Sequence, residues 1–160
     1  MRLFLIILSL FFAANCEAHS HLPKRLPSDL QISYNEGGGM LRAYKRITIE
    51  GGKLNFEELR GDRQEPEKWS ATLSADDVAK LYKVFVENRF DTIKNDKSHG
   101  IVYDAGSENI AISAGAAFSF HVTSGRNSPL SGSNLRRYDA VSGAIIDLLS
   151  RYNDKKSNSS

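Results

Sequence analysis

The stretch whose residue types could carry out acid–base chemistry lies between residues 95 and 107. His99 and Asp104 stand five residues apart there, with Tyr103 beside the aspartate and Ser107 three residues further on. A histidine paired with a carboxylate can move a proton to or from a nearby hydroxyl, which would suit a small hydrolase. Asp, Asn, Ser and Gly also serve the turns of exposed loops. We favour the loop interpretation and keep His99, Tyr103 and Asp104 as candidate binding residues, because binding residues concentrate on loops.

A second candidate segment covers residues 124–132 and contains Arg126. If a helix begins at its end, the free N–H groups of the first turn could hold an anion, with Arg126 adding positive charge. Capping of that helix by Ser131 or Ser133 explains the same residues, and we prefer it. Arg126 is kept as a candidate binding residue.

Other patterns that could carry chemistry are incomplete. Ser113 lacks the G-x-S-x-G setting of a hydrolase nucleophile. His19 and His21 have no carboxylate at ligand spacing, and the glycines at 37–39 do not continue into a nucleotide-binding loop. The sequence therefore predicts no catalytic residue, no metal site and no cofactor.

The N-terminus has the pattern of a secretory signal. Arg2 is followed by the run 3–14, in which Ser9 is the only polar residue. This run is shorter than the roughly 20 apolar residues that span a bilayer, and it matches the apolar region of a cleavable signal. Small residues before His19 predict cleavage after Ala18, which gives a signal peptide of residues 1–18.

An alternative cleavage site ends in the only cysteine of the chain. Residues 12–16 form a loose version of the lipobox of bacterial lipoproteins, in which Cys16 would become the lipidated first residue and the signal would be residues 1–15. Both readings place the protein outside the cytoplasm, in the periplasm, in the medium or anchored to the cell envelope by a lipid. Neither leaves a second cysteine for a disulfide.

Composition narrows the class of partner. The net charge is +2, and 21 basic and 19 acidic residues are interspersed along the chain. Because nucleic-acid-binding surfaces cluster their basic residues, we exclude that class. The expected partner is a protein or a cell-surface component, with membrane contact only through a lipid anchor.

The rest of the chain is predicted to form one domain over residues 29–152. Residues 19–28 are polar, contain two prolines and are typical of a leader or tether, and residues 153–160 are typical of a disordered tail. No internal repeat or long linker divides the domain.

The best-defined element is a hairpin around Gly51 and Gly52. Pairing across a two-residue loop places Ile49 opposite Leu54 and Ile47 opposite Phe56. The other face then pairs Glu50 with Lys53, Thr48 with Asn55 and Arg46 with Glu57. One register gives an apolar face and a charge-matched face together, so a one-residue slip is disfavoured.

The remaining elements complete an α+β fold. Strands are expected at 30–34, 69–73 and 90–93, and a second hairpin with a loop at 114–116 is expected to place Ile112 opposite Phe118 and His121 beside Asn109. A helix capped by Ser74 is expected to end near Asn88, and another is expected from about residue 133 to 152, with an apolar stripe that begins at Leu135. The predicted fold is an antiparallel sheet built from two hairpins plus short strands, with one face covered by two amphipathic helices in a two-layer sandwich.

These features together resemble a known but uncharacterised domain. The motifs are Tyr44-x-x-Ile47-Thr48-Ile49-x-Gly51-Gly52-x-Leu54, then Leu73-Ser74-x-x-Asp77-Val78-x-x-Leu81, then Tyr103-Asp104 and the hairpin 110–122. The chain resembles, over residues 39–149, a domain found in bacterial secreted proteins and lipoproteins. The resemblance implies the fold and the envelope location and carries no activity.

The sequence therefore predicts an exported, non-catalytic binding or structural module of the bacterial cell envelope. Two alternatives remain. One is the small secreted hydrolase that uses His99 and Asp104, and the other is a secreted protease inhibitor that presents the loop 60–68.

Overall fold

The computed structural model describes residues 20–38, 43–97, 100–103 and 105–157. Its elements follow the predicted order of strand, hairpin, strand, helix, hairpin and helix. They are β1 (Leu30–Gly37), β2 (Tyr44–Glu50), β3 (Lys53–Leu59), β4 (Glu67–Thr72), α1 (Ala75–Glu87), the 3₁₀ turn η1 (Phe90–Thr92), β5 (Ser107–Ala114), β6 (Phe118–Gly125) and α2 (Gly132–Ser157).

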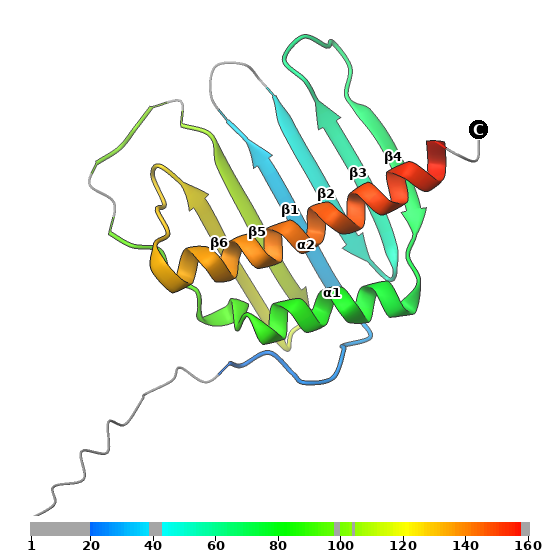
Figure 1. Ribbon diagram of the computed structural model, residues 1–160, viewed down its shortest axis with the longest axis horizontal. Helices are drawn as coiled ribbons and strands as arrows, with labels where there is room; N and C mark the ends of the chain where they lie inside the picture. The colour runs from blue at the N-terminus through cyan, green and yellow to red at the C-terminus, as the bar shows by residue number, and fades with distance from the viewer. Residues whose placement is uncertain (1–19, 39–42, 98–99, 104, 158–160) are drawn as a thin grey trace, which may run out of the picture.

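The six strands form one antiparallel sheet in the order β4-β3-β2-β1-β5-β6. Both helices lie on the same face of this sheet, and α2 crosses it diagonally from β6 towards β4 (Figure 1). The predicted α+β class is confirmed. Strand β1 is one of the two central strands and joins the two hairpins by pairing with β2 on one side and β5 on the other.

The first hairpin has the register that the sequence predicts. Ile49 pairs with Leu54 and Ile47 with Phe56, while Arg46 pairs with Glu57 on the outer face. Gly51 and Gly52 occupy the turn with φ values of 55° and 75°, a backbone region that side chains other than glycine rarely adopt.

The second hairpin is shifted by two residues from its predicted register. Its loop is 115–117, closed by a hydrogen bond of 2.9 Å from the Ala117 N–H to the Ala114 carbonyl oxygen. Phe118 therefore pairs with Ala114, Phe120 pairs with Ile112, and His121 lies beside Ala111. A shift of two residues keeps every side chain on its face, so hydrophobic alternation could not separate the two registers.

Two further expectations are corrected. Residues 90–92 form a 3₁₀ turn instead of a strand. Arg89 adopts a left-handed conformation (φ 48°) directly before them, and this changes the direction of the chain just after α1 ends. Helix α2 starts close to the expected residue but extends to Ser157, five residues beyond its expected end, so residues 153–157 of the predicted disordered tail are helical. Leu135 is 37% exposed, so the buried stripe of α2 begins at Tyr138.

The core lies between the sheet and the helices. Alternate residues of β1, β2, β3 and β5 face the core. From the helices they meet Leu81, Phe85, Val141 and Ile145, and each of these four is at most 3% exposed. Burying a side chain of this kind contributes about 1.5–3 kcal/mol, so this single layer of contacts holds the fold. The opposite face of the sheet carries polar side chains.

A polar network fastens the start of α1 to the end of α2. Asp77, three residues after the cap Ser74, accepts hydrogen bonds from the Ser74 hydroxyl (2.7 Å), the Tyr152 hydroxyl (2.8 Å) and Arg151 Nη1 (2.8 Å). The Ser74 Oγ in turn accepts from the Asp77 N–H at 3.1 Å. This reciprocal bonding is the predicted capping pattern, to which the second helix adds two donors.

The residues predicted to be a leader lie against the fold over 20–28. Leu22 is 5% exposed and belongs to the core, and the Ser20 hydroxyl donates to Asp91 at 2.8 Å. The Tyr82 hydroxyl donates to the Pro23 carbonyl oxygen at 2.6 Å. This segment runs beneath α1, at the end of the sheet where β1 begins (Figure 1).

Candidate functional site

A row of polar side chains crosses the sheet on the helix-facing side. The registers place Lys45 of β2 opposite both Glu58 of β3 and Glu36 of β1, Glu36 opposite Glu108 of β5, and Glu108 opposite Ser124 of β6. Residues directly opposite each other share a face. We call Glu58, Lys45, Glu36, Glu108 and Ser124 the polar row; it lies beyond the last apolar positions of the core.

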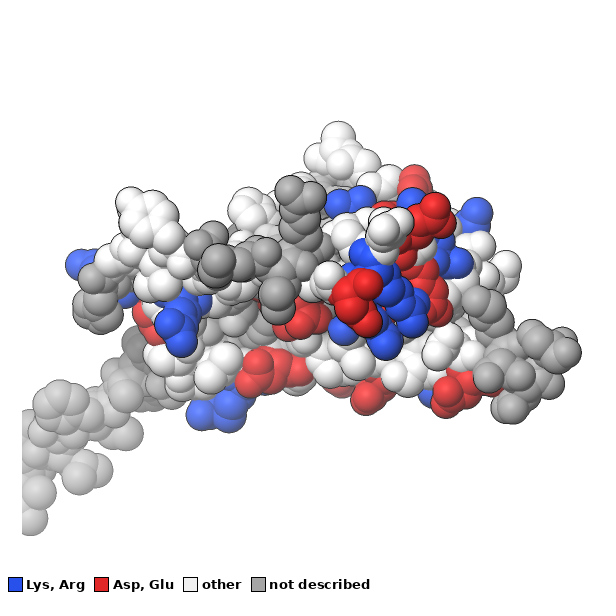
Figure 2. All heavy atoms as spheres, turned by 90° about the horizontal axis from the view of Figure 1, so that it is seen from above, with Lys and Arg blue, Asp and Glu red and all other residues white. Residues whose placement is uncertain are grey.

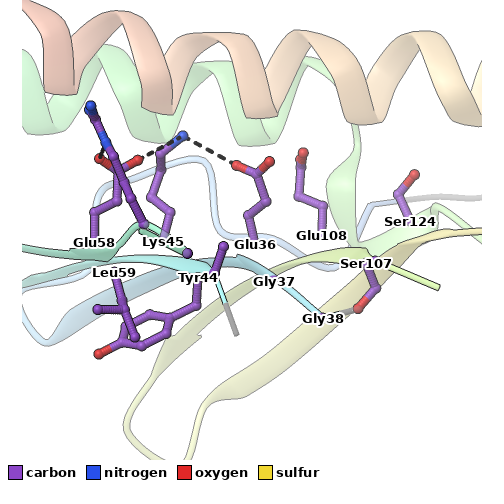
Figure 3. Close-up of a pocket in the computed structure, with 14 residues that line it drawn as sticks. Glu36, Gly37, Gly38, Tyr44, Lys45, Glu58, Leu59, Ser107, Glu108 and Ser124 are labelled. Carbon is purple, nitrogen blue, oxygen red and sulfur yellow. Dashed lines mark hydrogen bonds and ion pairs between the residues drawn. The ribbon is translucent and has the colours of Figure 1, made fainter. Parts of the chain in front are cut away.

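The polar row lies along a cleft of about 560 Å³ at the end of the sheet where β1 ends and β5 begins. In Figure 3 its side chains project to the same side of the sheet, towards the helices. We call this space the end cleft. It is open to solvent, and its volume falls in the range of small-molecule sites.

Glycines allow the chain to close in at the lip of the end cleft. Gly38 has a φ of 108°, and a Cβ there would lie 3.2 Å from the Ala105 carbonyl oxygen. A Cβ at Gly125 would lie 3.0 Å from the Gly106 carbonyl oxygen. Close backbone approach explains glycine at both positions, so Gly38 of the predicted turn is a feature of this lip.

Ion pairs order one half of the row. Lys45 Nζ lies 3.3 Å from Glu36 Oε2 and 3.9 Å from Glu58 Oε1, and Arg60 Nε lies 2.9 Å from Glu58 Oε2. The dashed lines of Figure 3 mark such contacts between the residues drawn. Glu58 thus has two cations and Glu36 has one. No ion pair reaches Glu108 from the part of the chain that the structure describes.

Two tyrosines lie beneath the carboxylates. Tyr34 and Tyr138 are 2% and 1% exposed, and the Tyr34 hydroxyl donates to Glu36 Oε2 at 3.1 Å. Burial, followed by the charge of Glu108, raises the pKa of both Tyr34 and Tyr138. Both phenols therefore remain protonated hydrogen-bond donors at neutral pH.

Glu108 Oε1 and the Tyr138 hydroxyl lie close together. Both atoms are buried, and within the described residues neither makes a hydrogen bond of strict geometry. Burial, the charge of Glu108 and a hydrogen bond between the two groups together raise the pKa of Tyr138, so the carboxylate and the phenol are polar partners of each other. Buried polar atoms almost always have a partner, and this pair finds it within the fold.

The charges around the cleft are mixed. Figure 2 looks onto this end of the molecule and shows acidic and basic side chains interleaved on the side of β3 and β4. Within residues 20–157, apart from the gaps, no group of three or more His, Cys, Asp or Glu side chains is placed to hold a metal ion. The described lining of the end cleft also contains neither histidine nor cysteine.

The candidate residues predicted from the sequence do not form this site. His99 and Asp104 lie outside the described residues, as does Cys16, so the proton-transfer pair and the lipid site stay predictions. Tyr103 is 86% exposed. Ser107, once considered beside them, is exposed at the start of β5 and lines the end cleft.

Tyr103 belongs to an exposed apolar tip with Ile101 and Val102, which are 79% and 38% exposed. Asn127 holds the backbone of this tip from both sides: its Oδ1 accepts from the Val102 N–H at 2.8 Å, and its Nδ2 donates to the Val102 carbonyl at 2.9 Å. Arg126 is exposed in the adjacent turn, and no contact described here brings it to the first turn of α2.

The residues of the polar row were missed because each looks like an ordinary surface charge. The available signal was the alternation: Glu36 and Lys45 continue the apolar faces of β1 and β2 at even spacing from Ile32 and Ile49. A charge at such a position indicates that the core has ended or that a polar site begins. Choosing between these needs the strand order.

No protein-family model matches the chain, and a search of curated proteins found no relative. The resemblance to a domain of bacterial secreted proteins and lipoproteins therefore stays a prediction. No helix among the described residues is long and apolar enough to cross a membrane.

Proposed function

We propose that this protein is an exported, non-catalytic binding domain of the bacterial cell envelope and that its ligand binds in the end cleft. One observation carries the proposal: the end cleft is an open space of about 560 Å³ whose lining includes the charged side chains of Glu36, Lys45, Glu58, Arg60 and Glu108 and the hydroxyls of Ser107 and Ser124. Sites for small ligands are concave spaces of this size with a few polar groups that orient the bound molecule.

The chemistry of the lining favours binding over hydrolysis. Ser107 and Ser124 are the serines of the described lining, which also includes Tyr44, and no histidine lies beside either serine there. A serine hydroxyl is a weak nucleophile without an adjacent base. The cleft can therefore hold and orient a molecule through hydrogen bonds and charge.

Binding in the cleft is tested by NMR titration of the ¹⁵N-labelled mature protein. The probes are acetylated tripeptide amides, Gly-X-Gly, in which X is Arg, Asp, Gln or Leu, and a neutral disaccharide. We expect at least one probe to shift the backbone amides of Glu36, Glu108 and Ser124 in a saturable way. If none of the probes shifts these amides, the end cleft is not a binding site.

Export is supported by the charged and apolar pattern of residues 2–14. The intact mass of the protein purified from its own host tests it. Loss of residues 1–18, or a diacyl or triacyl group on Cys16, would support export. An intact chain that begins at Met1 would contradict it.

A further inference from the structure

We infer that strand β6 is an interaction edge through which two copies of this chain pair, so that their sheets join into one. Strand β6 lies at one edge of the six-stranded sheet and β4 lies at the other (Figure 1). An edge strand presents backbone N–H and carbonyl groups that face no neighbouring strand, and such groups can pair with another chain. This edge is separate from the binding role proposed for the end cleft, and either can hold without the other.

The register identifies the backbone groups that β6 directs outward. In an antiparallel ladder, alternate residues direct both backbone groups to one neighbour, and the residues between them direct theirs to the other side. The Thr123 carbonyl accepts from Asn95 Nδ2 at 2.6 Å, and the Gly125 carbonyl accepts from a backbone N–H of the following turn at 3.1 Å. This set of residues therefore points away from β5. Ser119 and His121 belong to the same set by spacing, and within the described chain no other segment bonds their outward groups.

The composition of β6 leaves this edge unguarded. Residues 118–125 include no Lys, Arg, Asp or Glu and no proline. The opposite edge, β4, has Glu67 and Lys68 directly after Pro66, and both charged side chains take part in ion pairs. Charged residues and proline on an edge strand oppose pairing with other chains. Of the two edges, β6 is therefore the one suited to pairing.

A second copy of β6 fits this edge. Antiparallel pairing about a two-fold axis at Phe120 places Ser119 opposite His121 of the other copy, and each such pair exchanges two hydrogen bonds. The two Phe120 residues then lie opposite each other at a position where side chains approach most closely. Phe120 is half-buried and stacks on Phe118 with ring centroids 5.8 Å apart, so the pairing would cover apolar surface that the single chain leaves exposed.

The bond from Asn95 selects this register over its neighbour. A two-fold axis at His121 would pair Ser119 with Thr123, and the Thr123 carbonyl already accepts from Asn95. The open part of the edge is therefore residues 118–122. A register centred on Phe120 uses all of this open part.

Pairing of β6 with β6 ends at a dimer. Both copies use the same edge, so the contact is isologous, and the outer edges of the joined sheet are two copies of the guarded strand β4. Pairing of β6 with β4 would instead continue from copy to copy without closing. The charges of β4 oppose that arrangement, which favours a closed pair of copies.

The first experiment is sedimentation velocity of the mature protein from about 5 to 500 µM, with amide hydrogen exchange measured by NMR at both ends of this range. We expect an equilibrium between monomer and dimer. At the high concentration the amides of Ser119 and His121 should exchange more slowly, by about the inverse of the monomer fraction. The Phe120 amide should change little, because its residue already pairs with β5 in the single chain.

Two serine-to-proline variants compare the two edges. Ser119→Pro removes an outward N–H of β6 and leaves the bonds to β5 in place. Ser70→Pro is the matched control, since Ser70 is also exposed and, by the same alternation counted from the first hairpin, directs its N–H outward from β4. Ser119→Pro should weaken dimerisation about tenfold or more, because two-fold symmetry removes the bond twice, and Ser70→Pro should leave it unchanged.

A charge placed on the edge gives a second test that keeps every backbone N–H. His121→Lys should also weaken dimerisation, while Gln31→Lys, an exposed position on the same face of β1, should not. Midpoints of thermal unfolding show whether each variant is folded. If Ser119→Pro does not fold, the comparison of the two lysine variants decides.

Three outcomes would overturn the inference. A protein that stays monomeric up to about 500 µM would leave this edge to a strand of a different protein. A dimer that Ser119→Pro and His121→Lys weaken no more than their controls, or in which the Ser119 and His121 amides stay unprotected, would have its contact elsewhere. Growth beyond the dimer would mean that β6 pairs with β4.

Discussion

Replacing Asp77 with asparagine tests how the two helices are held together. Hydrogen bonds from Ser74 and Tyr152, opposed by burial and aided by Arg151, lower the pKa of Asp77 from its ordinary value of 3.8 to about 2. Its side chain is 11% exposed. The contacts of the folded state therefore stabilise the ionised form of the Asp77 side chain, compared with the unfolded chain.

The magnitude follows from the size of that change. A pKa lowered from 3.8 to about 2 corresponds to about 2.4 kcal/mol, since each pH unit is worth about 1.36 kcal/mol. Arg151 is 56% exposed, so solvent weakens its share of the contact, and we expect about 1–2 kcal/mol. The Asp77→Asn variant should lose that much free energy of unfolding at pH 7.

The pH dependence gives the sign. Because the folded pKa is the lower one, the stabilisation is complete above about pH 5 and is lost as the pH falls from the unfolded value towards 2. The difference between the natural protein and Asp77→Asn, measured by urea unfolding at pH 7, 5, 4 and 3, should therefore shrink with acid. The difference in free energy of unfolding between the two proteins is free of the pH dependence that the other carboxylates contribute to both.

The control is Asp76→Asn, at the neighbouring position in the first turn of α1. Asp76 bonds Lys80 at the surface, where both side chains are about 70% exposed. We expect a small effect with little dependence on pH. A penalty for Asp77→Asn that is the same at pH 3 and pH 7 would refute the reasoning, because it would mean that the charge of Asp77 is irrelevant to the network.

Three further predictions concern the backbone and the core. Gly143→Ala should raise the free energy of unfolding in urea by about 0.5–1 kcal/mol, because Gly143 lies inside α2 with open space at its Cβ position. Gly52→Ala should lower it by a similar amount, because Gly52 has a φ of 75°. Changes of the opposite sign would contradict these backbone conformations. Phe85→Ala should cost about 3–5 kcal/mol, since Phe85 is fully buried and packs on the Phe90 ring with centroids 5.0 Å apart; a loss below about 1 kcal/mol would argue against that packing. Asn127→Ala should speed hydrogen exchange of the Val102 amide, measured by NMR, and unchanged protection would disprove the clamp.

Local structure was readable from the sequence, and contacts between distant segments were not. The first hairpin was predicted in register because Gly51 and Gly52 fix its turn and its two faces differ in chemistry. The second hairpin has small residues on both sides of Gly115, so two registers satisfy the same alternation. The predicted strand at 90–93 failed because nothing in its composition signals the left-handed Arg89 before it.

The end cleft depends on a pairing that no local rule supplies. Lys45 and Glu58 meet through the first hairpin, so that half of the row follows from the predicted register. Glu36 and Glu108 meet because β1 inserts between the two hairpins, and about 70 residues separate them in sequence. The approach of Tyr138 to Glu108 depends further on how α2 crosses the sheet.

The packing of residues 20–28 beneath α1 fixes where the N-terminal segment joins the domain relative to the end cleft. This segment enters the fold where β1 begins, and the end cleft opens where β1 ends, a separation of roughly 20 Å along the strand. Because Leu22 and Ser20 are fixed to the domain, a group attached before residue 20 would be joined to the end of the sheet opposite the end cleft. If the chain were held on a surface by its N-terminus, the end cleft would face away from that surface.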